Sequence, residues 1–161
     1  MISVQNVKSW GGLEVGYYDA KKVEPLMPLL TQEFPNWPLS KIESYMNLVT
    51  TKNRDISGIL VAKNEANYYV GMLIYTFQQT NLNEKYDIFV VENLIASSLI
   101  LQSQVFLCLV ERGIEIARNK SCDLLELPKI DNKGYALIKA KYNKEISNSQ
   151  GFRTYLKLSK H

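Results

Sequence analysis

The side chains that most often carry enzyme chemistry are scarce in this chain of 161 residues. Its single histidine, His161, is the last residue. A Ser-His-Asp or Cys-His catalytic unit needs a positioned imidazole, and a chain end holds one poorly because terminal residues are seldom fixed in place. Metal sites built from several histidines are excluded for the same reason. Proton transfer is therefore left to carboxylates, tyrosines or water.

Cysteine chemistry is not indicated either. Cys108 and Cys122 form no Cys-x-x-Cys pair, and we expect both to be reduced, buried thiols of a cytoplasmic protein. The phosphate-binding fingerprints GxxxxGK[ST] and GxGxxG are also absent. We therefore predict no metal site and no redox centre.

Composition excludes further classes of function. The net charge of +3 is too small to predict nucleic-acid binding by itself. No apolar run approaches the roughly 18 residues of a membrane span, and the N-terminus lacks the pattern of a secretory signal. With 46% hydrophobic and 22% charged residues, the composition is that of a globular protein. We predict one cytoplasmic domain over residues 1–161, a monomer or homodimer, without nucleic-acid or membrane partners.

The periods of apolar residues and the turn residues predict the elements that would position a site. The order is β-α-α-β-β-β-α-β-α-β, over 13–18, 19–34, 40–50, 57–63, 68–77, 86–96, 103–120, 122–127, 131–142 and 152–158. Pro25 places a kink or a late start in the first helix, and Ser40 with Glu43 forms a capping box at the start of the second.

This order predicts an α+β fold with a mixed, mostly antiparallel central sheet and helices on both faces. Short connections make the strands at 57–63, 68–77 and 86–96 antiparallel. A helix separates 86–96 from 122–127, so these two strands should be parallel.

The order and length of these elements resemble the GNAT superfamily of acyl-CoA-dependent N-acetyltransferases over about residues 13–158. The segment Glu92–Ala96 (ENLIA) is similar to the family's fourth-strand end, often E-D-L-V-V. Helix 103–120 followed by Ser121–Leu127 (SCDLLEL) is similar to its third helix and fifth strand, and Gly151-Phe152 to its common Gly-Phe pair.

The resemblance implies acetyl-CoA or another acyl-CoA as co-substrate. Its pantetheine arm would pair like an added strand with the backbone of Leu94, Ile95 and Ala96. Its pyrophosphate would lie at a turn of the pattern R/Q-x-x-G-x-G/A, where helix amides attract phosphate. In register, that pattern falls on Leu101, Gln102, Ser103, Gln104, Val105 and Phe106.

This turn departs from the family pattern. Leu101 stands at the Arg position, while Gln104 and Phe106 stand at the two Gly positions. Serine hydroxyls at 97, 98 and 103 could donate to a phosphate. The alternative interpretation is a plain strand-to-helix connection with Ser103 as the helix N-cap.

For catalysis, the resemblance implies Glu92 as general base, directly or through water, and Tyr142 as the acid that protonates the leaving thiolate. Glu126 and Tyr135 are the second candidates for these roles. A carboxylate at the end of a mostly apolar strand is expected to be partly desolvated, which makes it a better base. Packing is the alternative role for Tyr142.

The family's acceptor pocket would be formed by the first two helices, with Trp37 and Tyr45 as candidate lining residues; core packing is the alternative for both. The resulting prediction is an N-acyltransferase that moves an acetyl or other acyl group to a primary amine of a small molecule or protein. A GNAT-fold binding or regulatory protein without catalysis, and an α+β interaction module without cofactor, remain open because fold does not fix function.

Overall fold

The computed structural model describes residues 4–18, 22–50, 53–79, 87–98, 102–128, 132–148 and 154–158. Among the predicted features, Leu101, the Gly151-Phe152 pair and His161 lie outside the described residues.

The core of the fold is one eight-stranded sheet with the order β1-β2-β3-β4-β5-β6-β8-β7. The strands are β1 (Val4–Trp10), β2 (Leu13–Tyr18), β3 (Ser57–Lys63), β4 (Tyr69–Gln78), β5 (Ile88–Ala96), β6 (Leu124–Leu127), β7 (Ile146–Asn148) and β8 (Thr154–Lys157). All neighbours are antiparallel except β5 and β6, which are parallel. The predicted α+β class, with a mixed and mostly antiparallel sheet, is confirmed.

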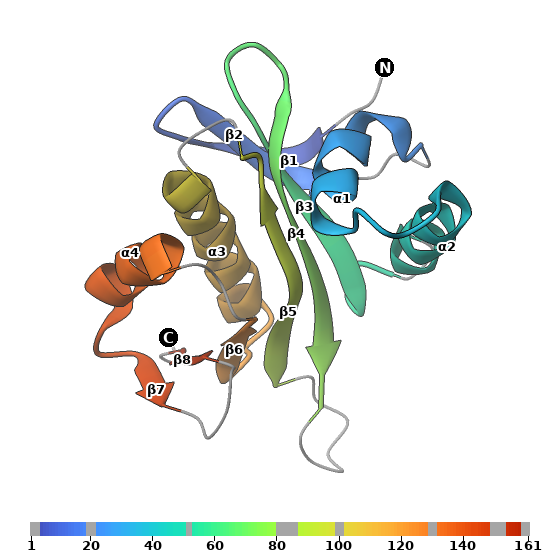
Figure 1. The fold of residues 1–161 in the computed structure, drawn as a ribbon. Helices are drawn as coiled ribbons and strands as arrows, with labels where there is room; N and C mark the ends of the chain where they lie inside the picture. The colour runs from blue at the N-terminus through green and yellow to red at the C-terminus, as the bar shows by residue number, and fades with distance from the viewer. Residues whose placement is uncertain are drawn as a thin grey trace.

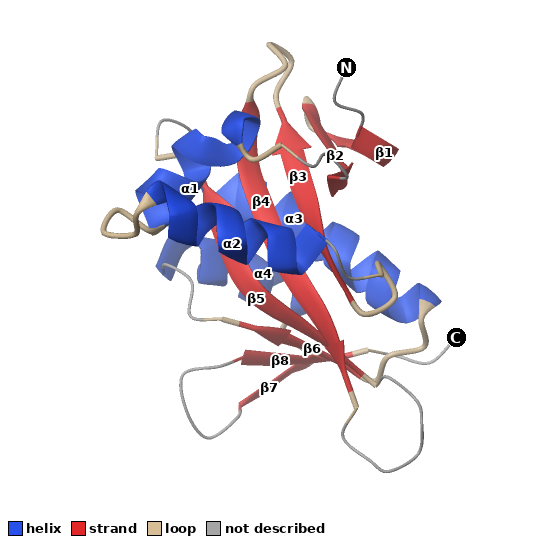
Figure 2. Cartoon of the chain, turned by 90° about the vertical axis from the view of Figure 1, so that its right-hand side faces the viewer, coloured by secondary structure: helices blue, strands red, loops and turns tan. Residues whose placement is uncertain are grey.

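Helices cover both faces of this sheet (Figures 1 and 2). A 3-10 turn at Glu24–Leu26 leads into α1 (Met27–Glu33), and α2 (Leu39–Thr50) follows on the same face. The other face carries α3 (Gln102–Asn119), against which α4 (Asn132–Tyr142) packs. The start of the first helix near Pro25 agrees with the prediction, because proline suits the first turn of a helix.

Two strands were missing from the sequence prediction. β1 pairs with β2, but its register shifts between Gln5 and Lys8, and such an irregularity interrupts the two-residue period by which a strand is recognised. β7 has only three residues, too few for a period to show. The predicted capping box is also wrong: α2 begins at Leu39, and the Pro38 carbonyl accepts the N–H groups of Lys41 and Ile42.

Apolar residues that alternate along the strands divide the core into two layers. On β4, Leu73 and Tyr75 pack under α3, whereas Met72 and Ile74 pack against α1 and α2. Because both faces are covered, the central strands are buried along nearly their whole length. Glu92 is an exception to this burial, because its side chain on β5 is exposed.

Gly71 of β4 allows α3 to lie close to the sheet. A Cβ atom at this position would come within 2.3 Å of Val105 Cγ1 and 3.2 Å of the Ile95 carbonyl oxygen. Val105 lies in the first turn of α3 and is 1% exposed. The glycine therefore determines where the N-terminus of α3 lies relative to β4 and β5.

We expect Gly71→Ala to lower the free energy of unfolding by about 1–3 kcal/mol, the usual range for overpacked cores. Urea denaturation measures this loss. The control is the double variant with Val105→Ala, in which the shortened side chain leaves room for the new methyl group. Its loss should be smaller than the sum of the two single losses. A Gly71→Ala protein as stable as the parent would show that α3 can move away without cost.

Candidate functional site

β5 contains a bulge at its middle. Ile74 of β4 lies opposite Asn93, whereas the next residue, Tyr75, lies opposite Val91. Glu92 is therefore an extra residue in β5, and a bulge of this kind changes the direction of the side chains around it.

The bulge places two consecutive side chains, Glu92 and Asn93, on the face of α1 and α2. Thr76 Oγ1 donates a hydrogen bond to Glu92 Oε1 at 2.8 Å, and Asn93 Nδ2 donates to the Tyr45 hydroxyl of α2 at 2.7 Å. The residues on either side of this pair pack under α3 instead. A regular strand would have sent one of the two polar side chains into that core.

The pairing of β5 with β6 ends just before the bulge. Their pairing joins Ile88–Val90 to Leu124–Glu126, and within the described residues no other strand pairs with the end of β5 on that side. Figure 1 shows the short β6 beside only one half of β5. The sheet therefore has a gap on the β6 side of β5 that begins after Val90, two residues before Glu92.

Leu94 and Ala96 direct their backbone groups into this gap. Alternate residues of an antiparallel strand bond to the same neighbour, and the Ser97 N–H donates to the Val70 carbonyl of β4 at 2.8 Å. Ile95 shares the direction of Ser97 and faces β4. Of the three predicted backbone partners of pantetheine, the geometry retains Leu94 and Ala96 and excludes Ile95.

Two glutamines hold the end of β5 in place. The Ala96 carbonyl accepts hydrogen bonds from Gln32 Nε2 of α1 at 2.8 Å and from Gln102 Nε2 of α3 at 3.0 Å. Gln32 Oε1 also accepts the Ser98 N–H at 2.9 Å. This clamp occupies the Ala96 carbonyl, so the groups that could pair with a ligand in the gap are the Leu94 N–H and C=O and the Ala96 N–H.

The predicted phosphate turn is the first turn of α3. The helix begins at Gln102, so Ser103 is its second residue and not its N-cap. Val105 and Phe106 are 1% and 7% exposed, and their side chains belong to the core rather than to a ligand site. The amides without an acceptor inside the helix are those that precede Val105, which leaves Gln102, Ser103 and Gln104 as the described candidates.

Glu92 is exposed. The expectation of a partly desolvated carboxylate at the end of an apolar strand is therefore wrong, because the bulge turns the side chain out of the buried layer. Its orientation comes from the Thr76 hydroxyl on β4. The structure thus offers a solvent-accessible carboxylate with one oxygen held in place.

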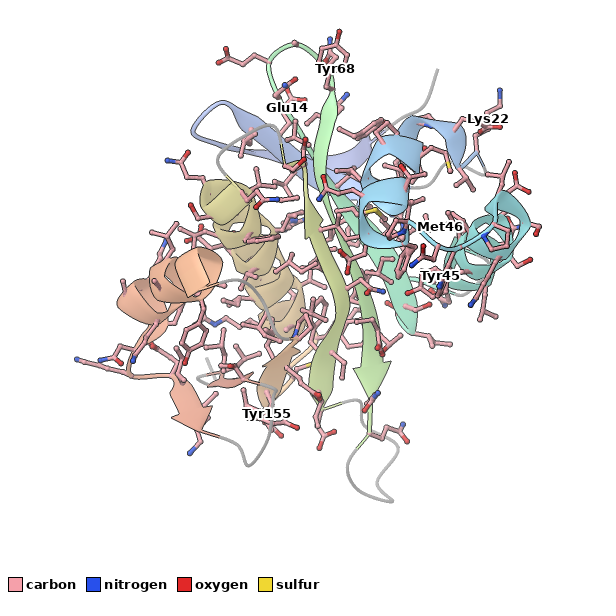
Figure 3. All side chains as sticks on the ribbon, in the orientation of Figure 1. Glu14, Lys22, Tyr45, Met46, Tyr68 and Tyr155 are labelled. Carbon is pink, nitrogen blue, oxygen red and sulfur yellow. The ribbon has the colours of Figure 1, made fainter. Side chains whose placement is uncertain are left out.

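A pocket of about 170 Å³ opens beside Glu92, and Tyr45 is part of its wall. Burial raises the pKa of the Tyr45 hydroxyl, the hydrogen bond from Asn93 lowers it, and the charge of Glu92 raises it. The hydroxyl therefore keeps its proton at neutral pH. Figure 3 shows Tyr45 on α2, near the α1 and α2 face of the sheet.

Trp37 has a supporting position instead. Its ring stacks on Phe34 with centroids 4.3 Å apart, and it meets the Tyr45 ring edge-on at 5.8 Å. The Trp37 side chain is absent from the wall of the pocket beside Glu92. Trp37 therefore has the alternative role of core packing, whereas Tyr45 both packs and lines the pocket.

Tyr142 lies on the other face of the sheet, at the end of α4. Its ring packs against the core under α3, and burial, followed by the charge of Glu111, raises the pKa of its hydroxyl. All the charged groups that act on this pKa belong to α3, α4 or the turn after α4. The structure therefore does not bring Tyr142 and Glu92 together on one face.

The remaining candidates are placed as follows. Glu126 is 7% exposed on β6, opposite Val90, and Tyr135 is half-buried on α4. Cys108 and Cys122 are buried and form no disulfide bond, as predicted, and burial raises the pKa of the Cys108 thiol to about 12. Over the described ranges, no cluster of three or more His, Cys, Asp or Glu side chains is arranged to hold a metal ion.

A larger hollow of about 540 Å³ lies toward the other end of the α1 and α2 face. Pro25 and Pro28 form one wall, and the residues from Tyr68 to Val70 form another. None of the described residues that line it has a carboxylate or a basic side chain. In the part of the chain that the structure describes, no helix is both long and apolar enough to cross a membrane.

Comparison with solved structures identifies the fold. The chain is similar to a GNAT-family acetyltransferase from Staphylococcus aureus, with a TM-score of 0.64 and 13% identity over 91% of this chain and 99% of that one. It is also similar to AAC(6')-Iy in complex with a bisubstrate analogue, with a TM-score of 0.67 and 12% identity over 86% and 93% of the two chains.

A third similar structure is a GNAT-family acetyltransferase from Elizabethkingia anophelis with acetyl-CoA bound. Its TM-score is 0.57, and it shares 13% identity over 88% of this chain and 80% of that one. No family model and no curated protein sequence matches the chain.

Proposed function

We propose that this chain, which has the fold of the GNAT acetyltransferases, is an N-acyltransferase that moves an acetyl or other acyl group from acyl-CoA to a primary amine. The observation that carries the proposal is the coincidence of three features on β5. The strand parts from β6 after Val90, bulges at Glu92, and presents the bulged carboxylate to a pocket.

An acyl-CoA in the gap would meet two sets of backbone groups. Leu94 and Ala96 offer backbone groups to the amides of a pantetheine arm, and the first turn of α3 offers free amides to a pyrophosphate. The two residues that replace the family's glycines obstruct the approach of the proposed pyrophosphate less than their sizes suggest. Phe106 is turned into the core, and Gln104 is exposed to solvent.

Glu92 then serves as the base that prepares the acceptor. An ammonium gives one proton to the carboxylate, directly or through water, and the amine nitrogen forms a bond with the acyl carbon as the carbon–sulfur bond breaks. A second proton leaves the nitrogen for solvent, and the CoA thiolate takes up a proton from an acid. Positioned proton-transfer groups typically contribute about 10²–10⁴-fold in rate.

Tyr45 is the tyrosine whose position fits the acid role. It lies on the same face as Glu92, and Asn93 donates to its oxygen, which leaves the hydroxyl proton available. Tyr142, the tyrosine implied by the family resemblance, lies on the face of α3 and α4. We therefore assign the proton donor to Tyr45 in this proposal.

A GNAT-fold binding or regulatory protein is the second candidate. The absence of glycine from the first turn of α3 favours it, because close approach of phosphate to helix amides is easiest over small residues. In that case CoA would bind without being turned over, or would not bind.

Calorimetry with CoA, dephospho-CoA and pantetheine tests the proposal. We expect all three to bind, because they share the arm that pairs with Leu94 and Ala96. Removal of the pyrophosphate should weaken binding only modestly, since this turn lacks glycine. Acetyl-CoA should then support transfer to an amine. Failure of every CoA species to bind would exclude the acyltransferase, and binding without transfer to any amine would favour the regulatory candidate.

A further inference from the structure

We infer that the acceptor is a primary monoamine with a short apolar body about the size of one ring, and that Glu92 holds its ammonium group. The inference rests on the proposed function and adds the chemical class of the acceptor. It is drawn from the walls of the 170 Å³ pocket beside Glu92. These walls are formed by Tyr45, Leu48, Val49, Ser57, Ile74, Thr76 and Glu92.

The charge in this lining suits one cationic group. Among the described residues of this lining, Glu92 is the single carboxylate, and none is a lysine or an arginine. Thr76 holds Oε1, which leaves Oε2 of the carboxylate for a donor from the ligand. A second ammonium in the same ligand would have to lie against Leu48, Val49 or Ile74, where an unpaired charge is costly.

The rest of the lining suits an apolar body. Val49 is 8% exposed and Ile74 is 1% exposed, so they form an apolar floor that has little contact with solvent. Leu48 stands at the rim of the pocket and is 59% exposed. The Ser57 hydroxyl is directed to the Val49 carbonyl at 3.4 Å. An apolar ligand would cover Leu48 and gain contact with the floor.

The volume limits the size of that body. A cavity of about 150 Å³ holds a molecule such as benzene, and this pocket is of similar size at about 170 Å³. A single ring or a branched chain of a few carbons therefore fills the pocket, whereas the further rings of a larger amine would extend beyond its walls. The Tyr45 ring offers an aromatic surface to such a body.

Calorimetry with benzylamine, in the absence of any acyl-CoA, tests this acceptor class. Benzyl alcohol has the same shape without the charge, and 1,4-diaminobutane has a second charge without the ring. We expect benzylamine to bind about tenfold more tightly than benzyl alcohol, because a hydrogen bond to a charged group is stronger than a neutral one. It should also bind more tightly than 1,4-diaminobutane, whose second ammonium would lie against apolar side chains. Glu92→Gln should remove this preference over benzyl alcohol.

Leu48→Ala tests the apolar wall, and Leu39→Ala is its matched control. Both leucines are exposed on α2, but only Leu48 lines the pocket. Leu48→Ala should weaken benzylamine and benzyl alcohol by a similar factor of a few fold, and Leu39→Ala should change neither.

The outcomes separate this inference from the proposed function. Benzylamine that binds no better than benzyl alcohol, or more weakly than 1,4-diaminobutane, overturns the acceptor class even where acetyl-CoA binds and is used. Benzylamine binding that depends on Glu92 and Leu48 supports the acceptor class even in a protein that fails to bind CoA, and in that case the acyltransferase proposal falls alone.

Discussion

Replacement of Glu92 by glutamine is expected to lower the turnover number of acyl transfer by about 10²–10⁴-fold, the usual contribution of a positioned base. Glutamine keeps the size of the side chain and can still accept the hydrogen bond from Thr76, but it cannot take a proton from an ammonium. Affinity for acyl-CoA should be nearly unchanged, because Leu94 and Ala96 offer backbone groups. Steady-state kinetics with acetyl-CoA and benzylamine, beside calorimetry with CoA, measure both effects.

Two tyrosine variants serve as the matched comparison in the same assay. Tyr45→Phe removes the hydroxyl on the face of Glu92 and should lower turnover as well, whereas Tyr142→Phe removes one on the other face and should have little effect. Turnover of Glu92→Gln equal to the parent would remove Glu92 from the mechanism and leave proximity as the better explanation. A loss seen only in Tyr142→Phe would return the acid role to Tyr142.

Replacement of Gln104 by glutamate is expected to weaken CoA binding by about tenfold or more at low salt. The new charge lies in the first turn of α3, where the proposed pyrophosphate is also anionic, and the repulsion should fade as salt screens it. The same charge interacts favourably with the helix dipole, so the free energy of unfolding should rise by about 0.3–1 kcal/mol. The CoA affinity measured by calorimetry should therefore fall, while the free energy of unfolding measured by urea denaturation should rise.

Gln104→Lys is the control with the opposite charge. It should tighten CoA binding and slightly lower stability, while pantetheine, which lacks the phosphates, should bind both variants like the parent. A glutamate variant that keeps full CoA affinity would show that the phosphates lie elsewhere. The change in the free energy of unfolding shows independently that the new charge interacts with the helix dipole.

Local patterns in the sequence were sufficient for most of the fold. The strand periods at 57–63 and 68–77 and the helical period at 103–120 appear in the structure within one or two residues, because buried apolar residues repeat with the geometry of the element that carries them. The parallel pairing of β5 with β6 also followed from chain order, since a helix must connect such strands. The family resemblance rested on this order, and the solved structures of similar fold agree with it.

Only part of the candidate site could be predicted from the sequence. The proposed roles of Glu92, Leu94 and Ala96 came from the family resemblance of the segment Glu92–Ala96 (ENLIA). The exclusion of Ile95 needed the hydrogen-bond register with β4, and the burial of Phe106 needed the packing of α3 on the sheet. Both depend on partners that are distant in the chain.

By itself, the sequence determined most of the elements and their order, because these follow from residue types and their spacing along one segment, but it did not show β1 or β7. Only the tertiary structure decided how those elements meet. A bulge exists when two residues oppose one on another strand, so no pattern within β5 could show that Glu92 and Asn93 share a face. The same is true of the gap beside β6, the glutamine clamp on Ala96 and the pocket between α2 and β4, each of which joins segments that only folding brings together.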